Sequence, residues 1–190
     1  MTLRRGFKAE AERQAAEQRA LLGLRPSEPI DPFRLLQLHQ ITVRTPDEVG
    51  ALALMPHQTS QILIGHADAW SALTVRTPVG VVVVHNPVHE RPRQHSNLTH
   101  ELAHVLLDHE PGALQTVGGC VMRDFDETQE EEARCLGDTL LAPRAALAHG
   151  ARRGMTTSQM ASWLGCSTQL TSYRANTTGI ARQYPRSGIR

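Results

Sequence analysis

One pentapeptide in the sequence, His100 to His104, has the residue types and the spacing that bind a metal ion and activate water. It reads His-Glu-Leu-Ala-His, an H-E-x-x-H pattern. Apolar residues recur at helical spacing from a capping Ser96 to about Asp108, and histidines four residues apart lie on one face of a helix. Zinc held there would polarise a carbonyl group and acidify a bound water, whose proton Glu101 can accept. The pattern therefore predicts His100 and His104 as zinc ligands and Glu101 as a general base, the alternative being two histidines on a purely structural helix.

A catalytic zinc site takes a third protein ligand and keeps one position for water. His109 is the next histidine along the chain, but no glycine turns the chain between it and His104, so we expect it to point elsewhere. A second helix is predicted to run to about Leu141, with Asp126 or Thr128 as its capping residue. Its early turns carry three consecutive glutamates, so we expect this helix to supply the third ligand.

The choice among Glu130, Glu131 and Glu132 follows from the faces of that second helix. The face of Glu130 also carries small and apolar residues that permit close packing, namely Ala133, Gly137 and Leu141. Glu131 shares its face with Arg134 and Asp138, which indicates a solvated side chain. Glu132 lies beside an apolar position and remains a competitor. We therefore expect Glu130 to be the third metal ligand, with Glu132 as the alternative.

The rest of the chain is predicted to form a small sheet and four further helices. The expected helices are Ala9 to Leu22, Asp31 to His39, Thr156 to Leu164 and Ser167 to Ala175. The expected strands are Ile41 to Arg44, Leu52 to Met55, Gln61 to Ile64, Leu73 to Arg76 and Val81 to Val84. Pro78 and Gly80 predict a hairpin turn between the last two strands. The segment containing Pro111, Gly112, Gly118 and Gly119 is expected to be a loop.

The composition is that of an ordinary globular protein, with 40% hydrophobic and 21% charged residues and a net charge of +1. This excludes a disordered chain, a fibrous protein and a nucleic-acid coat. The basic start is followed by charged residues rather than an apolar core, and the longest apolar run, Val79 to Val84, is too short to span a bilayer. Three widely spaced cysteines, Cys120, Cys135 and Cys166, indicate a reducing compartment. We therefore expect a cytoplasmic protein that does not bind a membrane.

Charge is distributed unevenly along the chain. Residues 100 to 138 hold ten acidic residues against two arginines, whereas residues 139 to 190 hold seven arginines and no acidic residue. In that basic segment Gly165 separates two capped helices, a pattern typical of a helix-turn-helix. The second of these helices could offer Gln169, Ser172 and Arg174 to DNA bases. DNA binding is therefore possible but less favoured than packing or docking of a protein substrate.

Seven segments, taken together with their order and spacing, resemble the ImmA/IrrE family of bacterial and phage metallo-endopeptidases over most of residues 10 to 175. In chain order, the matching segments are Pro29 to Phe33 with Leu35, Ile41 to Val43, Val81 to Asn86, Arg91 to Gln94, His100 to Leu107, Glu130 to Ala133 and Leu140 to Pro143. This set is far more specific than the H-E-x-x-H pattern alone.

The resemblance implies a zinc endopeptidase with one ion bound by His100, His104 and a glutamate of the second helix. In the family's E-x-x-A-N pattern the first glutamate corresponds to Glu130, and Glu101 corresponds to the catalytic base. Manganese or iron could occupy the same ligands. Members of the family typically cleave or inactivate a helix-turn-helix repressor, so the resemblance implies a protein substrate of that kind.

Arg134 departs from the family pattern, which has Asn or Asp after the alanine. An arginine cannot accept the N–H of a zinc-bound imidazole, so that hydrogen bond would have to come from elsewhere. The alternative function, from a different class, is a non-catalytic zinc-containing regulator that binds DNA or a repressor through the basic C-terminal segment. Peptide hydrolysis also needs a group that stabilises the oxyanion of the tetrahedral intermediate. Tyr173, Arg174, Tyr184 and His95 are candidates for this role, and the sequence does not decide among them.

The resemblance also implies an α+β fold of the small zincin-like type. A short mixed or antiparallel sheet is expected to pack on the H-E-x-x-H helix and the second ligand-bearing helix. Residues 1 to 28 are expected to form an N-terminal helix and linker, residues 29 to 145 the metallopeptidase core, and residues 146 to 190 a basic, helix-turn-helix-like segment. The sequence does not indicate an oligomeric state.

Overall fold

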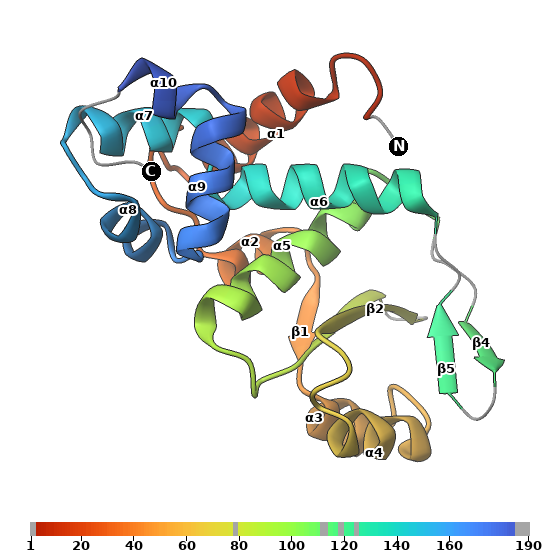
Figure 1. Ribbon diagram of the computed structural model, residues 1–190. Helices are drawn as coiled ribbons and strands as arrows, with labels where there is room; N and C mark the ends of the chain where they lie inside the picture. Colours follow the sequence, from red (N-terminus) through yellow and green to blue (C-terminus); the bar gives the residue numbers. More distant parts are fainter. Residues whose placement is uncertain (1–2, 78–79, 111–113, 118–119, 124–125, 185–190) are drawn as a thin grey trace.

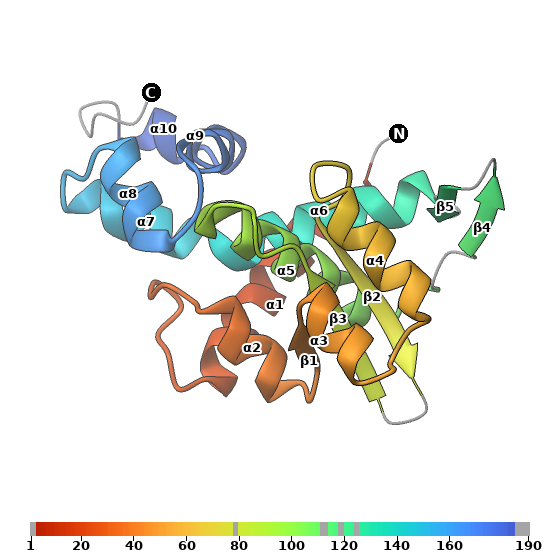
Figure 2. The same ribbon diagram turned by 90° about the horizontal axis from the view of Figure 1, so that it is seen from below.

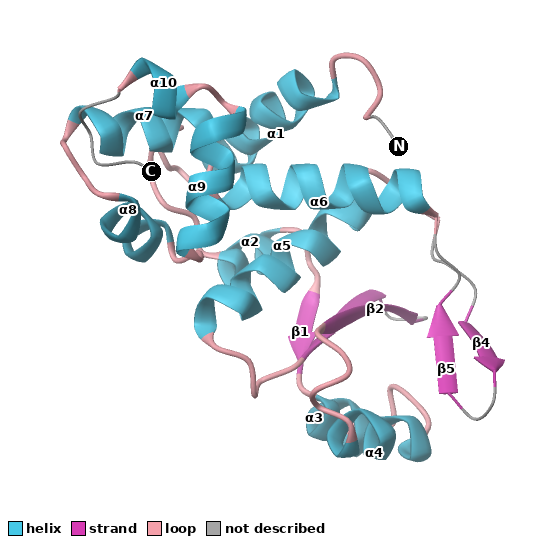
Figure 3. Cartoon of the chain, in the orientation of Figure 1, coloured by secondary structure: helices cyan, strands magenta, loops and turns pink. Residues whose placement is uncertain are grey.

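The computed structural model describes residues 3–77, 80–110, 114–117, 120–123 and 126–184. Side chains are described for all of these residues except 77, 114–117 and 120–123. The helices are α1 (Phe7–Leu21), α2 (Pro32–Leu38), α3 (Pro46–Ala51), α4 (His57–Gly65), α5 (Arg91–Leu106), α6 (Glu127–Leu141), α7 (Arg144–Arg152), α8 (Thr157–Leu164), α9 (Thr168–Thr177) and α10 (Ile180–Gln183). The strands are β1 (Thr42–Arg44), β2 (Ala72–Thr77), β3 (Gly80–His85), β4 (Leu114–Val117) and β5 (Cys120–Arg123). Figure 3 shows how the helices and strands are distributed along the chain.

The principal sheet has the strand order β1-β3-β2, with β1 parallel and β2 antiparallel to β3. Alternate residues of β3 face opposite sides of this sheet, as strand geometry requires. Val83 belongs to the main core with Leu98 and Leu102 of α5. Val82 and Val84 pack instead with residues of the α3–α4 segment. The sheet is therefore covered on both faces, by α5 on one and by α3 and α4 on the other (Figure 2).

The main core lies where α6 packs against α5 and against α1 (Figure 1). Leu98 and Leu102 of α5 and Leu136 and Leu140 of α6 are completely buried there. The described part of the chain is thus a mixed α+β zincin-like fold, which confirms the predicted fold class. No helix among the described residues is long and apolar enough to cross a bilayer.

Most helix ends fall where the capping residues predicted them. Asp31 accepts a hydrogen bond from the backbone N–H of Phe33, and Asp126 accepts from Thr128 and Gln129, so Asp126 rather than Thr128 caps α6. Thr156 forms a reciprocal capping box at the start of α8. Gly165, in the left-handed conformation with φ of 68°, ends α8 and allows the sharp turn into α9.

The strands predicted at Leu52 to Met55 and Gln61 to Ile64 are wrong, because the first segment is a turn and the second lies within α4. Short apolar runs do not by themselves distinguish a strand from a helix. The stronger local signal is Thr45, which caps α3 in a box with Glu48 just before Pro46 at the first helical position. That signal begins α3, whereas α4, which contains Gln61 to Ile64, begins at His57 without a side-chain cap.

Three further expectations differ from the structure. The helix that carries the H-E-x-x-H pattern begins at Arg91 rather than at Ser96, because Pro92 is well suited to a first helical turn. The expected loop after this helix contains the antiparallel pair β4 and β5; its four Pro and Gly positions, 111, 112, 118 and 119, lie outside the described residues. Helix α7 was not predicted, since Arg144 to Arg152 begins without a side-chain cap.

Candidate metal centre

The site is built where α5 and α6 approach each other most closely, and Gly137 makes this approach possible. A Cβ atom at position 137 would lie 3.1 Å from the backbone nitrogen of His100 and 3.2 Å from its Cα. Backbone atoms of a helix cannot move aside as the end of a side chain can. Gly137 lies on the same face of α6 as Glu130, so the contact that brings the helices together also aims Glu130 at α5.

His100 and His104 extend from one face of α5 and meet Glu130 of α6. The two Nε2 atoms are 3.1 Å apart. Glu130 places Oε2 3.1 Å from Nε2 of His100 and Oε1 3.3 Å from Nε2 of His104. Ligand atoms of all three residues therefore lie within 4.8 Å of one another. This grouping is what the helical-face argument predicted for Glu130.

The spacing of these three groups fits a divalent ion. Bonds of about 2.1 Å in tetrahedral directions put neighbouring ligand atoms about 3.4 Å apart. The observed separations of 3.1 and 3.3 Å are close to that edge length. Two imidazole nitrogens and one carboxylate are also the ligand types found in catalytic zinc sites that keep a position for water. The three residues could therefore hold one metal ion.

Electrostatic coupling between the three groups is strong. Hydrogen bonds from His100 and His104 hold the pKa of Glu130 well below its usual range. Burial works to lower the pKa of His100, but its hydrogen bond to Glu130 and the nearby Glu101 carboxylate raise it above its usual value. A carboxylate next to two imidazoles thus attracts positive charge to one small volume. A divalent cation can supply that charge in place of protons.

Glu101 lies between the two histidines in the sequence and is almost completely buried. Its Oε2 accepts a hydrogen bond of 2.5 Å from Oγ1 of Thr74 on β2. Thr74 is the direct partner of Val83 on β3, and residues directly opposite in a sheet share a face, which here is the face covered by α5. The sheet therefore fixes one oxygen of the glutamate expected to act as the base. Sequence reasoning missed Thr74, because its partner is 27 positions away.

Glu131 and Glu132, the two other candidates for the third ligand, lie outside the cluster. Glu131 is partly buried. Glu132, the alternative ligand, pairs with Arg4 at 3.0 Å and faces His109 at 3.5 Å. Arg134 is exposed. The structure therefore brings Glu130, and not its two neighbours, to the two histidines of α5.

His109 is the second residue that sequence reasoning missed. It is not in the three-residue cluster, but a turn that the absence of glycine did not lead us to expect brings its Nδ1 to 3.0 Å from Nδ1 of His104. The chain turns at Asp108, a non-glycine residue with φ of 51°. Aspartate adopts this conformation more readily than most residues. The turn signal was therefore present in the sequence as Asp108, although no glycine marks it.

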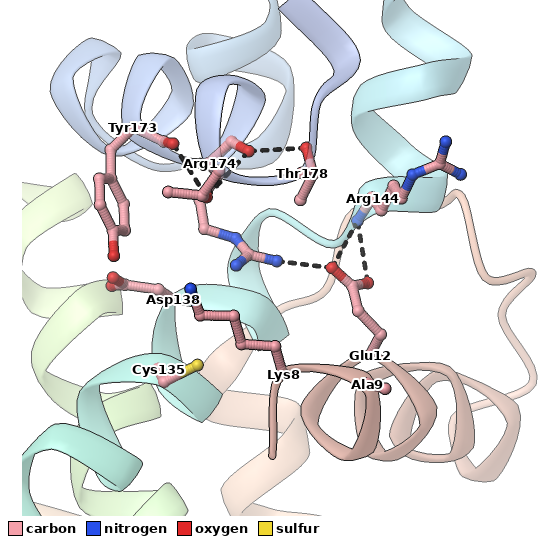
Figure 4. Close-up of a pocket in the computed structure, with 10 residues that line it drawn as sticks. Lys8, Ala9, Glu12, Cys135, Asp138, Arg144, Tyr173, Arg174 and Thr178 are labelled. Carbon is pink, nitrogen blue, oxygen red and sulfur yellow. Dashed lines mark hydrogen bonds and ion pairs between the residues drawn. The ribbon is translucent and has the colours of Figure 1, made fainter. Parts of the chain in front are cut away.

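The C-terminal helices form a separate pocket of about 220 Å³ with α1 and α6 (Figure 4). Arg174 of α9 is buried, donating to the backbone oxygen of Ala142 and to Oε1 of Glu12 at 2.7 Å. Asp138 points into the same pocket, and burial raises its pKa. Arg174, one of the three side chains that the less favoured DNA-binding hypothesis would offer to bases, is therefore buried in the protein interior.

Two residues that could have stabilised an oxyanion also have structural partners. His95 is buried and lies 2.8 Å from the carbonyl oxygen of Gly165, at the turn between α8 and α9. Arg174 is held by Ala142 and Glu12 as described above. Both side chains connect α9 or its preceding turn to the rest of the protein.

Comparison with known proteins identifies one family. Residues 54–176 match the model of the family Peptidase_M78, described as the IrrE N-terminal-like domain. The matched range contains His100, His104 and Glu130, and also Glu101 and Thr74. A search of curated proteins and a search of solved structures each gave no match.

Proposed function

The chain belongs to the IrrE N-terminal-like family of metallopeptidases, and from this premise we propose that it is a zinc-dependent endopeptidase that cleaves a helix-turn-helix transcriptional repressor. The observation that carries the proposal is the grouping of His100, His104 and Glu130 within 4.8 Å. Glu101 lies on the same helix, one residue from the first of these histidines. A metal-ligand set with a buried carboxylate beside it is the arrangement that peptide hydrolysis requires.

His100 and His104 would hold the ion through Nε2, and Glu130 through its carboxylate. Bound zinc supplies a Lewis acid that polarises the scissile carbonyl group and lowers the pKa of water. Glu101 accepts the proton of the attacking water and passes it to the leaving amine. Because Thr74 donates to Oε2 of Glu101, the other carboxylate oxygen, Oε1, is the one available for this proton.

The position of Glu101 next to an edge strand supports an extended peptide as the substrate. Among the described strands, β2 pairs with β3 alone, so its second edge offers backbone N–H and carbonyl groups. An extended peptide can add to such an edge as a further strand. Thr74 belongs to β2 and contacts Glu101, so a peptide added there would pass close to the base. This placement favours a protein substrate over a small molecule.

The competing function is that of a non-catalytic regulator that binds DNA through the C-terminal segment. The burial of Arg174 weighs against this function, because the side chain already binds Glu12 and the backbone of Ala142. Gln169 is exposed but carries no charge that could bind a phosphate. The C-terminal helices are better explained as support for α6 and as a surface for the protein substrate.

The proposal is tested with purified protein that contains one equivalent of zinc and with the repressor encoded by the adjacent gene. We expect wild type to cut the repressor into two fragments. Glu101→Gln should lose cleavage by about a thousandfold or more while it retains zinc. Glu131→Gln, which removes a carboxylate outside the cluster, serves as the matched control and should cleave normally.

Two results would overturn the proposal. Cleavage that survives Glu101→Gln would show that Glu101 is not the base. If wild type and Glu101→Gln both shift operator DNA equally and neither cuts the repressor, the regulator function is correct. Mass spectrometry of the fragments and metal analysis of each variant supply the readouts.

A further inference from the structure

Helix α5 ends in a turn that returns the chain toward the metal centre. Leu107 is the C-cap, Asp108 adopts the left-handed conformation, and the backbone N–H of His109 donates to the carbonyl oxygen of His104 at 3.0 Å. The N–H of Asp108 donates to Val105 at 3.2 Å. These two bonds define a Schellman motif, in which the second residue after the cap lies beside the third-last helical residue. The motif therefore places His109 beside His104.

In most motifs of this type an apolar contact joins these two positions. Here the contact joins two imidazoles, with Nδ1 of His104 and Nδ1 of His109 3.0 Å apart and ring centroids 5.0 Å apart. Both side chains are 7% exposed. Two buried nitrogens at this distance form a hydrogen bond in which one donates and the other accepts.

The direction of this hydrogen bond follows from the side of His104 that faces the cluster. Nε2 of His104 faces His100 and Glu130. A neutral imidazole that offers the Nε2 lone pair to an ion carries its proton on Nδ1. Nδ1 of His104 is then the donor and Nδ1 of His109 is the acceptor. Neutral His109 consequently carries its own proton on Nε2.

Glu132 stands at the place where that second proton needs an acceptor. Its Oε2 lies 3.5 Å from Nε2 of His109. Its other oxygen, Oε1, accepts from Nε of Arg4 at 3.0 Å. Arg4 precedes α1, so the N-terminal segment holds Glu132 turned toward His109 and away from Glu130. In the series Arg4, Glu132, His109 and His104, each N–H group that points at the next residue therefore faces an acceptor.

We propose that His109 is a positioning residue for the metal centre, which fixes the tautomer and ring orientation of His104 and is itself oriented by Glu132. This inference rests on the proposed function in one respect, namely that His104 binds the metal ion. It also explains how the imidazole N–H can have an acceptor although position 134 is an arginine, which cannot accept a hydrogen bond from a metal-bound imidazole. The orienting acceptor comes from the turn after α5 instead of from α6.

The test compares the zinc affinity of two substitutions at position 109. His109→Leu removes the acceptor, and we expect zinc affinity to fall about 10- to 100-fold. His109→Asn places a carbonyl oxygen near the position of Nδ1, so it should restore most of the affinity. His66→Leu replaces an exposed histidine and should leave the affinity unchanged. Zinc affinity is measured by competition with a chromophoric chelator, with no peptide substrate present.

Equal zinc affinity of wild type and His109→Leu would overturn the inference, as would an equal loss in His109→Leu and His109→Asn. A purely structural role would lower the melting temperature of the metal-free protein in both variants without this difference between them. Because no substrate is used, the result is independent of peptidase activity. A protein that binds zinc through this network and cuts no repressor would refute the proposed function alone.

A second measurement tests the hydrogen-bond directions in unmodified protein. Long-range proton–nitrogen correlation spectra of the zinc-loaded wild type should show the proton of His104 on Nδ1 and that of His109 on Nε2. A proton on Nδ1 of His109 would reverse the direction of the hydrogen bond and overturn the inference. This measurement does not depend on whether a variant folds.

Discussion

Oγ1 of Thr74 lies 2.5 Å from Oε2 of Glu101 and joins the edge strand of the sheet to the helix that carries His100 and His104. A hydrogen bond to an ionised carboxylate is worth more than one between neutral groups. We expect Thr74→Val, which preserves the shape of the side chain, to reduce cleavage about tenfold. Zinc affinity should stay at the wild-type value, since Thr74 does not contact the cluster.

Thr74→Ser is the control for that substitution because it keeps the hydroxyl group. Its cleavage rate should lie near that of wild type. Steady-state cleavage of a repressor-derived peptide gives both rates. If Thr74→Val cleaves as fast as Thr74→Ser, the hydroxyl group does not orient the base.

Close packing of α5 on α6 makes position 137 sensitive to an added methyl group. Alanine favours a helix over glycine by about 1 kcal/mol, but its Cβ would lie 3.1 Å from the backbone of His100. Overpacking of this kind costs about 1–3 kcal/mol. We expect Gly137→Ala to lower both the free energy of unfolding and the zinc affinity, because α5 must shift relative to Glu130.

Gly65 in α4 provides the comparison, since no atom lies within 4 Å of a Cβ built at that position. Gly65→Ala should therefore be close to wild type in both properties. Thermal unfolding with and without zinc separates the two effects. Unchanged zinc affinity in Gly137→Ala would mean that the ligands tolerate a shift of the helix.

The features that were predictable from the sequence are those set by local spacing. The four-residue interval places His100 and His104 on one face, and the small residue Gly137 marks the face of α6 that carries Glu130. Most helix starts were predicted on the same local basis, whereas the zincin-like fold class was predicted from the resemblance to a known family. That these three residues bind zinc stays a prediction until metal analysis is carried out.

The features that could not be predicted depend on contacts between distant parts of the chain or on uncommon backbone angles. Thr74 meets Glu101 only once β2 has paired with β3. His109 turns back because Asp108 adopts a conformation that most residues avoid. The segment from Leu52 to Ile64 was assigned to strands because its apolar runs are too short to show a helical period.

A buried arginine connects the C-terminal ends of α1 and α6. Arg19 is completely buried and donates to the carbonyl oxygens of Ala15, Glu28 and Leu140 at 3.1, 2.8 and 2.8 Å. Burial lowers its pKa to about 10. We expect Arg19→Met to reduce the free energy of unfolding by about 3 kcal/mol, because buried carbonyl groups lose their donors.

Arg13 lies on the same helix, and its side chain is 66% exposed. Arg13→Met should change the free energy of unfolding by less than about 0.5 kcal/mol. Urea unfolding of both variants measures the difference. Equal effects at the two positions would show that the three hydrogen bonds of Arg19 make no net contribution to the free energy of unfolding.

His95 makes the stability of the connection between α5 and the C-terminal helices dependent on pH. Nε of Arg91 donates to Nε2 of His95 at 3.0 Å, so the proton of neutral His95 is on Nδ1, which faces the carbonyl oxygen of Gly165 at 2.8 Å. Burial lowers the pKa of His95 below its usual 6.5, the bond to Gly165 acts in the opposite direction, and the charge of Arg91 lowers it further. Protonation of His95 would place a proton on Nε2. The ring could then no longer accept the hydrogen bond from Arg91 and would carry a positive charge beside the arginine.

Because this pKa is lowered on folding, the unfolded chain binds the proton more readily than the folded protein does. The contribution of neutral His95 to stability is therefore complete above pH 6.5 and is lost as the pH falls from 6.5 toward the lower folded-state pKa, with a slope of at most about 1.4 kcal/mol per pH unit.

His95→Gln does not titrate. We expect it to be less stable than wild type at pH 8, and the difference should narrow between pH 6.5 and pH 5. Urea unfolding of the metal-free proteins measures this difference, with His66→Gln, at an exposed position, as the control whose curve stays parallel to that of wild type. A constant difference between wild type and His95→Gln across this range would show that His95 does not change its protonation on unfolding.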